Sequence, residues 1–231
     1  MIFIDTILKS REQLSEEYSY AEFIDFIDLS FWSKDFGRRL NPYYPYGDIP
    51  IPYDSGCMKA CCVESVWQGL KVFEEADVDK DVFQLYQPNE LERVQYEKGN
   101  LLGFRRGVYG HDILTYEEAY RGIYVKTYKW MIENHAKDII DSIREIHEKT
   151  TIVLLDVNTN YFEGTLGHCL SHAYLVKAYT LGLPPFEDVF EVKDEHHYMT
   201  NGRRSWDVVT KKRVPKEIIF HNDKQMSIDF Y

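Results

Sequence analysis

The chain has 231 residues, of which 44% are hydrophobic and 15% aromatic, a composition that can bury the core of one generous domain. Its formal net charge of −11 argues against a broad basic face that grips nucleic acid through its phosphates, and is compatible only with a local basic pocket. The four cysteines lack the spacing of a disulfide scaffold, and no signal peptide or membrane-spanning segment is predicted. We therefore expect a cytoplasmic protein with no membrane partner.

The first part of the chain predicts an α/β beginning, then a loop and a helix. Residues 1–8 and 21–29 are typical of strands that flank a short helix over residues 11–18. Residues 41–56 hold four of the eight prolines, which predicts an ordered, irregular loop because proline fixes φ and cannot donate a hydrogen bond. Such loops often carry function. Residues 61–73 then predict an amphipathic helix.

The middle of the chain is predominantly helical in its pattern. The stretch that leads to residue 110 predicts a second helix and a glycine-marked turn over residues 103–110. Thr115 and Glu118 form a capping box, which predicts the start of a further helix. Residues 135–149 continue this helical pattern. In the helix that begins at Thr115, apolar or aromatic side chains recur at helical spacing, at Ile123, Tyr124, Tyr128 and Met131.

The last part returns to strands. Residues 150–156 form a β-branched apolar run, which predicts a buried strand with Asp156 at its end. Residues 169–182 predict a helix that a glycine and two prolines terminate. Residues 186–231 alternate like short strands. The whole pattern predicts a helix-rich α+β fold with a small mixed sheet, in a single domain over residues 1–231.

Residues 61–73 place several polar or aromatic side chains on one helical face. At about 100° per residue, Gln68 lies about 40° from Glu64, and Lys71 lies about 20° away on the other side. Trp67 lies on the same side as Lys71. A face of this kind is ordinarily solvated, which is the alternative to a functional site. The Trp67 indole argues for a cover, either another segment of the chain or a stacked ligand.

Glu64 and Lys71 suit acid–base and nucleophilic chemistry. On a helix they are about 10 Å apart along the axis, too far for the usual ion pair between positions i and i+4. They could instead flank a reacting bond, with the amine as nucleophile and the carboxyl group as proton carrier, provided that partial burial tunes their protonation. Gln68 lies between them and could hold a substrate hydroxyl or amide group.

The spacing Glu-x-x-x-Gln-x-x-Lys resembles the signature helix of the NADAR family of N-glycosidases (YbiA-like proteins), which reads approximately Glu-His-aromatic-aromatic-Gln-Ala-x-Lys-Phe. Glu64, Gln68 and Lys71 match this signature in register. Trp67 supplies the aromatic residue before the glutamine. Ser65 replaces the family histidine, which is a departure from the pattern.

Outside this helix the resemblance is looser, and it covers residues 41–182. The motif "GFRRG" at residues 103–107 lies where the family has a basic turn, and Asp156 takes the place of an acidic residue at the end of a late strand. The family's later Trp-Gly element has no clear counterpart. The chain also resembles bacterial and phage proteins that share the phrases "YPYGDIPIP", "VWQGLKVF" and "LSHAYLVKAY". The resemblance implies a NADAR-like fold, with residues 186–231 as a strand-rich extension.

The function that the resemblance implies is cleavage of the bond between ribose and a base, since family members remove ADP-ribose from guanine bases. Lys71 would attack the anomeric carbon and form a covalent lysyl-ribose intermediate that water releases. Glu64 would move protons, and Asp156 would orient a ribose hydroxyl or assist the same transfers. The substrate would be a small-molecule nucleotide or an ADP-ribosylated base, with transient nucleic acid contact and no cofactor.

Other side chains are candidates for holding the substrate. Arginine forks suit phosphate oxygens, so Arg39 and Arg105 are candidates for a diphosphate, with an ordinary surface arginine as the alternative for each. Tyr44 is a candidate for stacking on a base, as is Trp67, with buried packing as the alternative. The remaining predicted substrate contacts are Gln68, Asn160 and His172.

The pair His168 and His172 has a spacing that zinc could use, but no cysteine pair supports it, so no metal site is predicted.

Two alternatives to an N-glycosidase stay open. A glycosyl or ADP-ribosyl transferase would pass the ribose to an acceptor other than water. A non-catalytic module would bind ADP-ribose or a nucleotide without needing both Glu64 and Lys71. No feature of the sequence predicts an oligomeric state.

Overall fold

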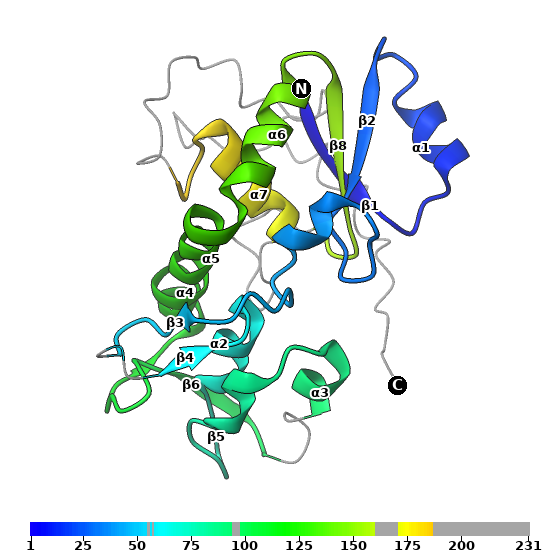
Figure 1. Cartoon of the computed structure of the whole chain (residues 1–231). Helices are drawn as coiled ribbons and strands as arrows, with labels where there is room; N and C mark the ends of the chain where they lie inside the picture. The colour runs from blue at the N-terminus through cyan, green and yellow to red at the C-terminus, as the bar shows by residue number, and fades with distance from the viewer. Residues whose placement is uncertain (55, 57, 94–97, 160–170, 187–231) are drawn as a thin grey trace, which may run out of the picture.

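The computed structural model describes residues 1–54, 56, 58–93, 98–159 and 171–186 (Figure 1). Within them the helices are α1 (Arg11–Glu17), α2 (Val63–Gly69), α3 (Pro88–Arg93), α4 (Tyr116–Ala119), α5 (Val125–Met131), α6 (Lys137–His147) and α7 (His172–Leu181). The strands are β1 (Ile2–Thr6), β2 (Ile24–Asp28), β3 (Ile49–Pro50), β4 (Lys59–Ala60), β5 (Lys71–Phe73), β6 (Leu101–Arg105), β7 (Ile113–Leu114) and β8 (Thr151–Asp156). The predicted helix-rich α+β fold is confirmed.

The parallel sheet has β8 in its centre, between β1 and β2. The β8 strand is buried on both faces, as its apolar run predicts. On one face α1 packs through Leu14 and Tyr18, while α6 and α7 lie on the other (Figure 1). The two predicted N-terminal strands and the short helix between them are therefore confirmed.

The remaining described strands form separate antiparallel sheets, with the orders β3-β4 and β5-β6-β7. The sheets are thus individually parallel or antiparallel, rather than one mixed sheet. The predicted loop over residues 41–56 is largely irregular but contributes the two-residue strand β3. The predicted turn starting at Gly103 begins later, because Gly103 lies within β6 and pairs with Val72.

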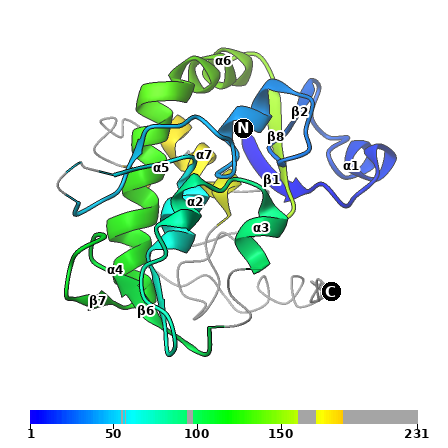
Figure 2. The same ribbon diagram turned by 60° about the horizontal axis from the view of Figure 1, so that its bottom comes forward.

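A long helical run crosses the molecule and connects the two regions. It passes from α4 through the π-helical turn η3 (Tyr120–Tyr124) to α5, and through a second one, η4 (Ile132–Ala136), to α6. It bends at Ala136, whose φ of −131° and ψ of 19° depart from helical values. In Figure 2 this run lies along one flank with α2 beside it. The predicted capping box is present, since the Glu118 amide donates to Thr115 Oγ1.

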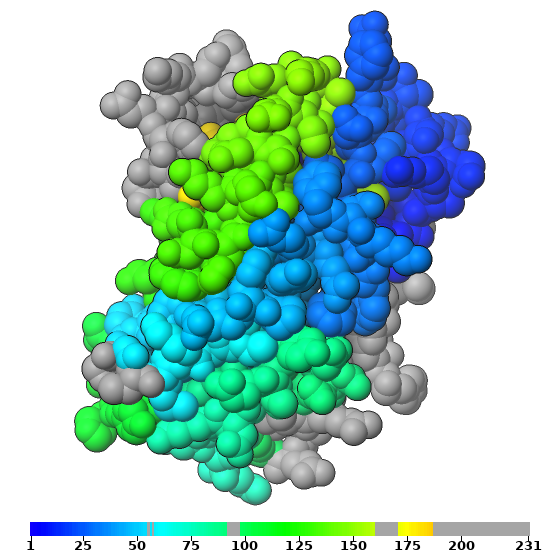
Figure 3. Space-filling view, in the orientation of Figure 1, coloured from blue at the N-terminus to red at the C-terminus, as the bar shows by residue number. Residues whose placement is uncertain are grey.

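The segment of residues 30–50 leads from β2 of the parallel sheet to β3. In the space-filling view it lies between the N-terminal strands and the region that follows residue 50 (Figure 3). This segment contains the 3-10 turn η1 (Phe36–Leu40). A second 3-10 turn, η2 (Asp81–Gln84), lies outside it and packs on α2.

Of the helices in the described ranges, none has the length and hydropathy that crossing a membrane requires. Apart from Phe186, the predicted extension over residues 186–231 lies outside the described residues.

Candidate functional site

Helix α2 begins with a cap that a cysteine and a serine share. The Ser65 amide donates to Cys62 Sγ at 3.3 Å, and the Cys62 amide donates to Ser65 Oγ at 3.0 Å. Ser65 is fully buried and forms part of this N-terminal cap. It stands at the position where the NADAR signature has histidine. Burial raises the pKa of the Cys62 thiol to about 12, which leaves it protonated and poorly nucleophilic.

Glu64 lies in the first turn of α2 and is buried, with 9% of its surface exposed. Its carboxylate accepts a hydrogen bond from Gln68 Nε2, one helical turn further on. Its amide donates to the carbonyl of Pro42 at 2.9 Å, which fixes the helix start against the proline-rich loop. The Glu64 carboxylate is therefore held in the interior, with the Gln68 amide as one of its hydrogen-bond donors.

The face around Trp67 is covered by protein rather than solvent. The ring is 4% exposed, and its centroid lies 4.0 Å from that of Phe104. Tyr116 and Tyr124 contact it edge to face, at centroid distances of 5.7 and 5.5 Å. Other segments of the chain therefore cover the Trp67 indole. With 4% of its surface exposed, Trp67 has no free ring face for a substrate base, which corrects the prediction that it stacks on one.

Lys71 lies on a strand and not on the helix. The helix ends at Gly69, because the Gly69 and Leu70 carbonyls accept from Asp79 and Arg105 at 3.2 and 2.7 Å instead of from further helical amides. Lys71 then pairs with Phe104 as the first residue of β5. The predicted helix over residues 61–73 is therefore too long. Lys71 stays half-buried, immediately after the helix that carries Glu64.

The two arginines predicted to bind phosphate are engaged with carboxylates of the chain. Arg39 Nη1 lies 2.6 Å from Asp138 Oδ2, and Arg39 Nη2 donates to the His135 carbonyl at 2.7 Å. Arg105 binds Asp77 through two nitrogens, with Nε at 3.0 Å from Oδ1. Each guanidinium therefore joins separate segments of the fold. That these arginines hold a diphosphate stays a prediction.

A buried polar network forms at the carboxyl end of the parallel sheet, where β8 ends. Asp156 Oδ2 accepts from Ser171 Oγ at 2.7 Å and lies 3.0 Å from His172 Nδ1. The other imidazole nitrogen, Nε2, lies 3.1 Å from the Leu29 carbonyl after β2. We call Asp156, Ser171 and His172 the Asp156 network. It joins β8 to α7, and through the Leu29 carbonyl it reaches the end of β2, 143 positions before His172 in the sequence.

The Asp156 network continues toward α2 through a shared carbonyl. The Leu29 carbonyl that contacts His172 also accepts from Asn41 Nδ2 at 2.9 Å. Asn41 immediately precedes Pro42, whose carbonyl holds the Glu64 amide. A short series of contacts thus connects the Glu64 helix with the parallel sheet. Asp156 is only 3% exposed and its two oxygens accept hydrogen bonds, so it holds these elements together, and its catalytic role stays a prediction.

Tyr128 of α5 lies close to the same network. It is fully buried, and its hydroxyl donates to the Leu40 carbonyl. Burial raises the pKa of this phenol well above its ordinary value, and the nearby negative charge of Asp156 adds to the effect. Tyr128 therefore remains a neutral hydrogen-bond donor that ties the long helical run to the segment before α2.

The other predicted site residues divide into two groups. Tyr44 is half-buried, with its ring centroid 4.7 Å from that of Tyr46, so it stays a candidate for contact with a ligand. His172, predicted to contact the substrate, makes its hydrogen-bonding contacts with Asp156 and the Leu29 carbonyl. Asn160 and His168 lie outside the described residues.

Sequence reasoning missed Lys177, a lysine in the interior of α7. It is 4% exposed, and burial lowers the pKa of its ammonium to about 7. A buried lysine with this pKa is a nucleophilic amine near neutral pH. The signal was available, because Lys177 is the one charged residue in the run "HAYLVKAYTL". Ser171 was also missed, although a serine directly before a helix is a typical N-cap.

The fold and these contacts define a single α+β domain with a buried carboxylate on α2 and a second one in the Asp156 network. The sequence profile of a family of unknown function (DUF6939) matches residues 7–176. The chain therefore belongs to this family, whose matched region includes α2, β8 and the first half of α7. No curated protein matches the chain.

Proposed function

We propose that this protein is an N-glycosidase that cleaves the bond between ribose and a base, with an ADP-ribosylated base or a nucleotide as substrate. The observation that carries the proposal is the burial of Glu64 on α2, with Gln68 bound to it and Lys71 half-buried on the next element. The resemblance of this segment to the NADAR signature supports the same reading. Ordinary surface residues of a solvated helix face would not be buried in this way.

In the proposed reaction the Lys71 amine attacks the anomeric carbon while the bond from that carbon to the base nitrogen breaks. Glu64 donates a proton to the departing base. Opening of the ribose ring and loss of the amine proton then give an imine between Lys71 and the sugar. Water adds to this imine with Glu64 as base, and the free sugar and the amine are restored.

The structure changes how the supporting residues are assigned within this proposal. Asp156 and His172 position β8, α7 and the loop before α2, and Trp67 supports α2 from the core. Tyr44 and Gln68 remain for contact with the substrate. Cys61 and Cys62 are free thiols, and the proposal accordingly includes a cytoplasmic location. The proposal includes a transient contact with nucleic acid only for a modified base that is part of a nucleic acid strand.

The decisive experiment is mass spectrometry of the intact protein incubated with NAD+, ADP-ribose and an ADP-ribosylated guanine oligonucleotide, with borohydride added to reduce an imine. We expect a stable adduct that peptide mapping assigns to Lys71, together with released ADP-ribose. Lys71→Ala should lose both signals. The matched control is Lys59→Ala, which removes an exposed lysine from β4 and should leave both unchanged.

The buried amine of Lys177 makes the site of the adduct informative. An adduct on Lys177 that survives in Lys71→Ala would keep the lysine chemistry and overturn the assignment of the nucleophile. Turnover by Lys71→Ala without any adduct would overturn the covalent mechanism. Transfer of ribose to an added acceptor in place of hydrolysis would identify a transferase. Tight binding with neither adduct nor release would identify a binding module.

A further inference from the structure

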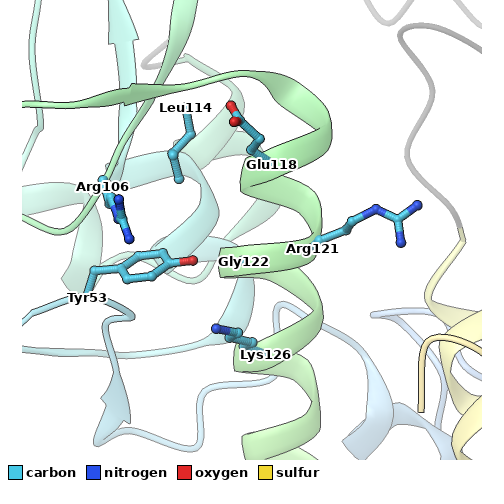
Figure 4. A pocket seen from close by; sticks show the side chains of 7 residues that line it. All are labelled: Tyr53, Arg106, Leu114, Glu118, Arg121, Gly122 and Lys126. Carbon is cyan, nitrogen blue, oxygen red and sulfur yellow. The ribbon is translucent and has the colours of Figure 1, made fainter. Parts of the chain in front are cut away.

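A cavity of about 400 Å³ lies beside the first turns of the long helical run. We call it the Tyr53 cavity, and its walls are formed by Tyr53, Arg106, Leu114, Glu118, Arg121, Gly122 and Lys126 (Figure 4). Its volume is within the range of small-molecule sites. In Figure 4 the Tyr53 hydroxyl points at Gly122, while Arg121 extends away from the Tyr53 ring.

The backbone is shaped around Tyr53. This residue has a φ of 62°, in the left-handed region that non-glycine residues seldom occupy and that costs about 1–3 kcal/mol. Two glycines make close approach to it: a Cβ at Gly107 would lie 2.6 Å from the Tyr53 carbonyl oxygen, and one at Gly122 would collide with the Tyr53 hydroxyl. The position of this 45% exposed ring is therefore set by its surroundings and is not that of a loose surface side chain.

Two cations flank the ring. The Arg106 guanidinium carbon lies 5.0 Å from the ring centroid, and Lys126 Nζ lies 5.3 Å from it. Arg106 is 53% exposed and its contact with Asp112 is long, at 3.6 Å, so this ion pair neutralises little of its charge. The fold thus holds two positive charges around one phenol, in a chain whose net charge is −11.

Glu118, the acidic residue of the cavity wall, also forms the N-terminal capping box of α4. Its carboxylate accepts from the Thr115 amide and from Thr115 Oγ1, both at 2.8 Å. These hydrogen bonds cap the helix, and they lower the pKa of Glu118, so the group stays ionised at the helix start. Both bonds use Oε2, and the negative charge of the carboxylate also interacts with the nearby Arg106. The lining of the cavity has three cationic side chains against this one carboxylate, so it keeps a net positive charge that suits an anion from outside.

We propose that the Tyr53 cavity binds the phosphate group of a small molecule. Arg106 and Lys126 supply charged donors, and the Tyr53 hydroxyl supplies a third donor between them. A phosphate matches this set because it carries close to two negative charges and three acceptor oxygens. The site lies on the face of the helical run that carries Glu118, Gly122 and Lys126, whereas Tyr116 and Tyr124 on another face contact Trp67. The inference therefore stands independently of the proposed glycosidase.

The test is calorimetric titration of the full chain with inorganic pyrophosphate at low ionic strength. We expect saturable binding that weakens about tenfold or more in Arg106→Gln/Lys126→Gln, since each change removes a charged hydrogen bond. Tyr53→Phe keeps the ring and should also weaken binding. The matched control, Arg38→Gln/Lys137→Gln, removes the same charge from exposed positions outside the cavity and should bind like the unchanged protein.

Two results would overturn the proposal. One is the absence of saturable pyrophosphate binding by the unchanged protein. The other is an equal loss in the cavity variant and in the control, which would indicate attraction by overall charge alone. Unchanged thermal unfolding of the variants shows that they remain folded. Titration with ADP separates the sources of the phosphate: equal affinity for ADP and pyrophosphate indicates phosphate recognition alone, and tighter ADP binding indicates that the nucleoside also contacts the cavity.

Discussion

The imidazole of His172 contacts the carboxylate of Asp156 at 3.0 Å while both side chains are buried. The second nitrogen of the ring lies 3.1 Å from the Leu29 carbonyl. The pair therefore joins the first helical residue of α7 to the ends of two neighbouring strands.

Removing the Asp156 carboxylate should destabilise the fold. Asp156→Ala leaves His172 and Ser171 buried without their acceptor, and each buried polar group left unsatisfied costs about 1–3 kcal/mol. Urea denaturation measures this loss of unfolding free energy. Asp138→Ala is the control, because its carboxylate is 61% exposed in an ion pair with Arg39 and should cost less than about 1 kcal/mol. Equal losses in the two variants would contradict the positioning role.

Trp67→Ala should be far more damaging than the same change at Trp32. The Trp67 ring is 4% exposed among three aromatic side chains, whereas Trp32 is 72% exposed. Truncating a buried tryptophan costs about 3–5 kcal/mol, and an exposed substitution changes stability by about 0.5 kcal/mol or less. The midpoints of urea denaturation compare the two variants directly. Full stability of Trp67→Ala would mean that its ring does not belong to the core.

Lys177 should make stability depend on pH above neutrality. Burial lowers the pKa of Lys177 from 10.5 to about 7, so between these pH values the unfolded chain binds more protons than the folded one. The free energy of unfolding therefore rises with pH across this window, by on the order of 1 kcal/mol per pH unit from this residue. Lys177→Met should lose this slope and be more stable than the unchanged protein near pH 7.

Urea denaturation at several pH values between 7 and 10 tests the slope. Lys137→Met is the matched control, because Lys137 is exposed on α6 and should retain the pH dependence of the unchanged protein. Identical pH profiles for Lys177→Met and the unchanged protein would show that Lys177 does not titrate in this range.

Within the proposed function, Glu64→Gln should act on catalysis rather than on folding. The amide is nearly isosteric but carries no proton to transfer, so kcat for release of the base should fall about 10²–10⁴-fold. Glu75→Gln makes the same change at an exposed position nearby and should leave kcat unchanged. A Glu64→Gln enzyme with normal kcat would remove Glu64 from the mechanism, and circular dichroism checks that both variants fold.

The elements that local patterns determine were predicted correctly from the sequence. The Thr115–Glu118 capping box and the stop at Gly182 rest on interactions within a few residues. The apolar run that ends at Asp156 is a local pattern too, although the strand it forms pairs with β1 and β2. The end of α2 was predicted wrongly, because pairing of Lys71 with Phe104 terminates the helix from outside. Helical periodicity does not register a competing strand that lies 33 positions away in the register Lys71↔Phe104.

The sequence by itself determined the α+β class, the buried central strand and the choice of Glu64, Gln68 and Lys71 as candidates. Only the tertiary structure decided which residues are joined: His172 and Leu29 meet across 143 positions, and Arg39 meets Asp138 across 99. Periodicity and capping report the energetics of adjacent turns, whereas burial and the pairing of charges depend on which elements pack together. The arginines, Trp67 and Lys177 received their roles from that packing.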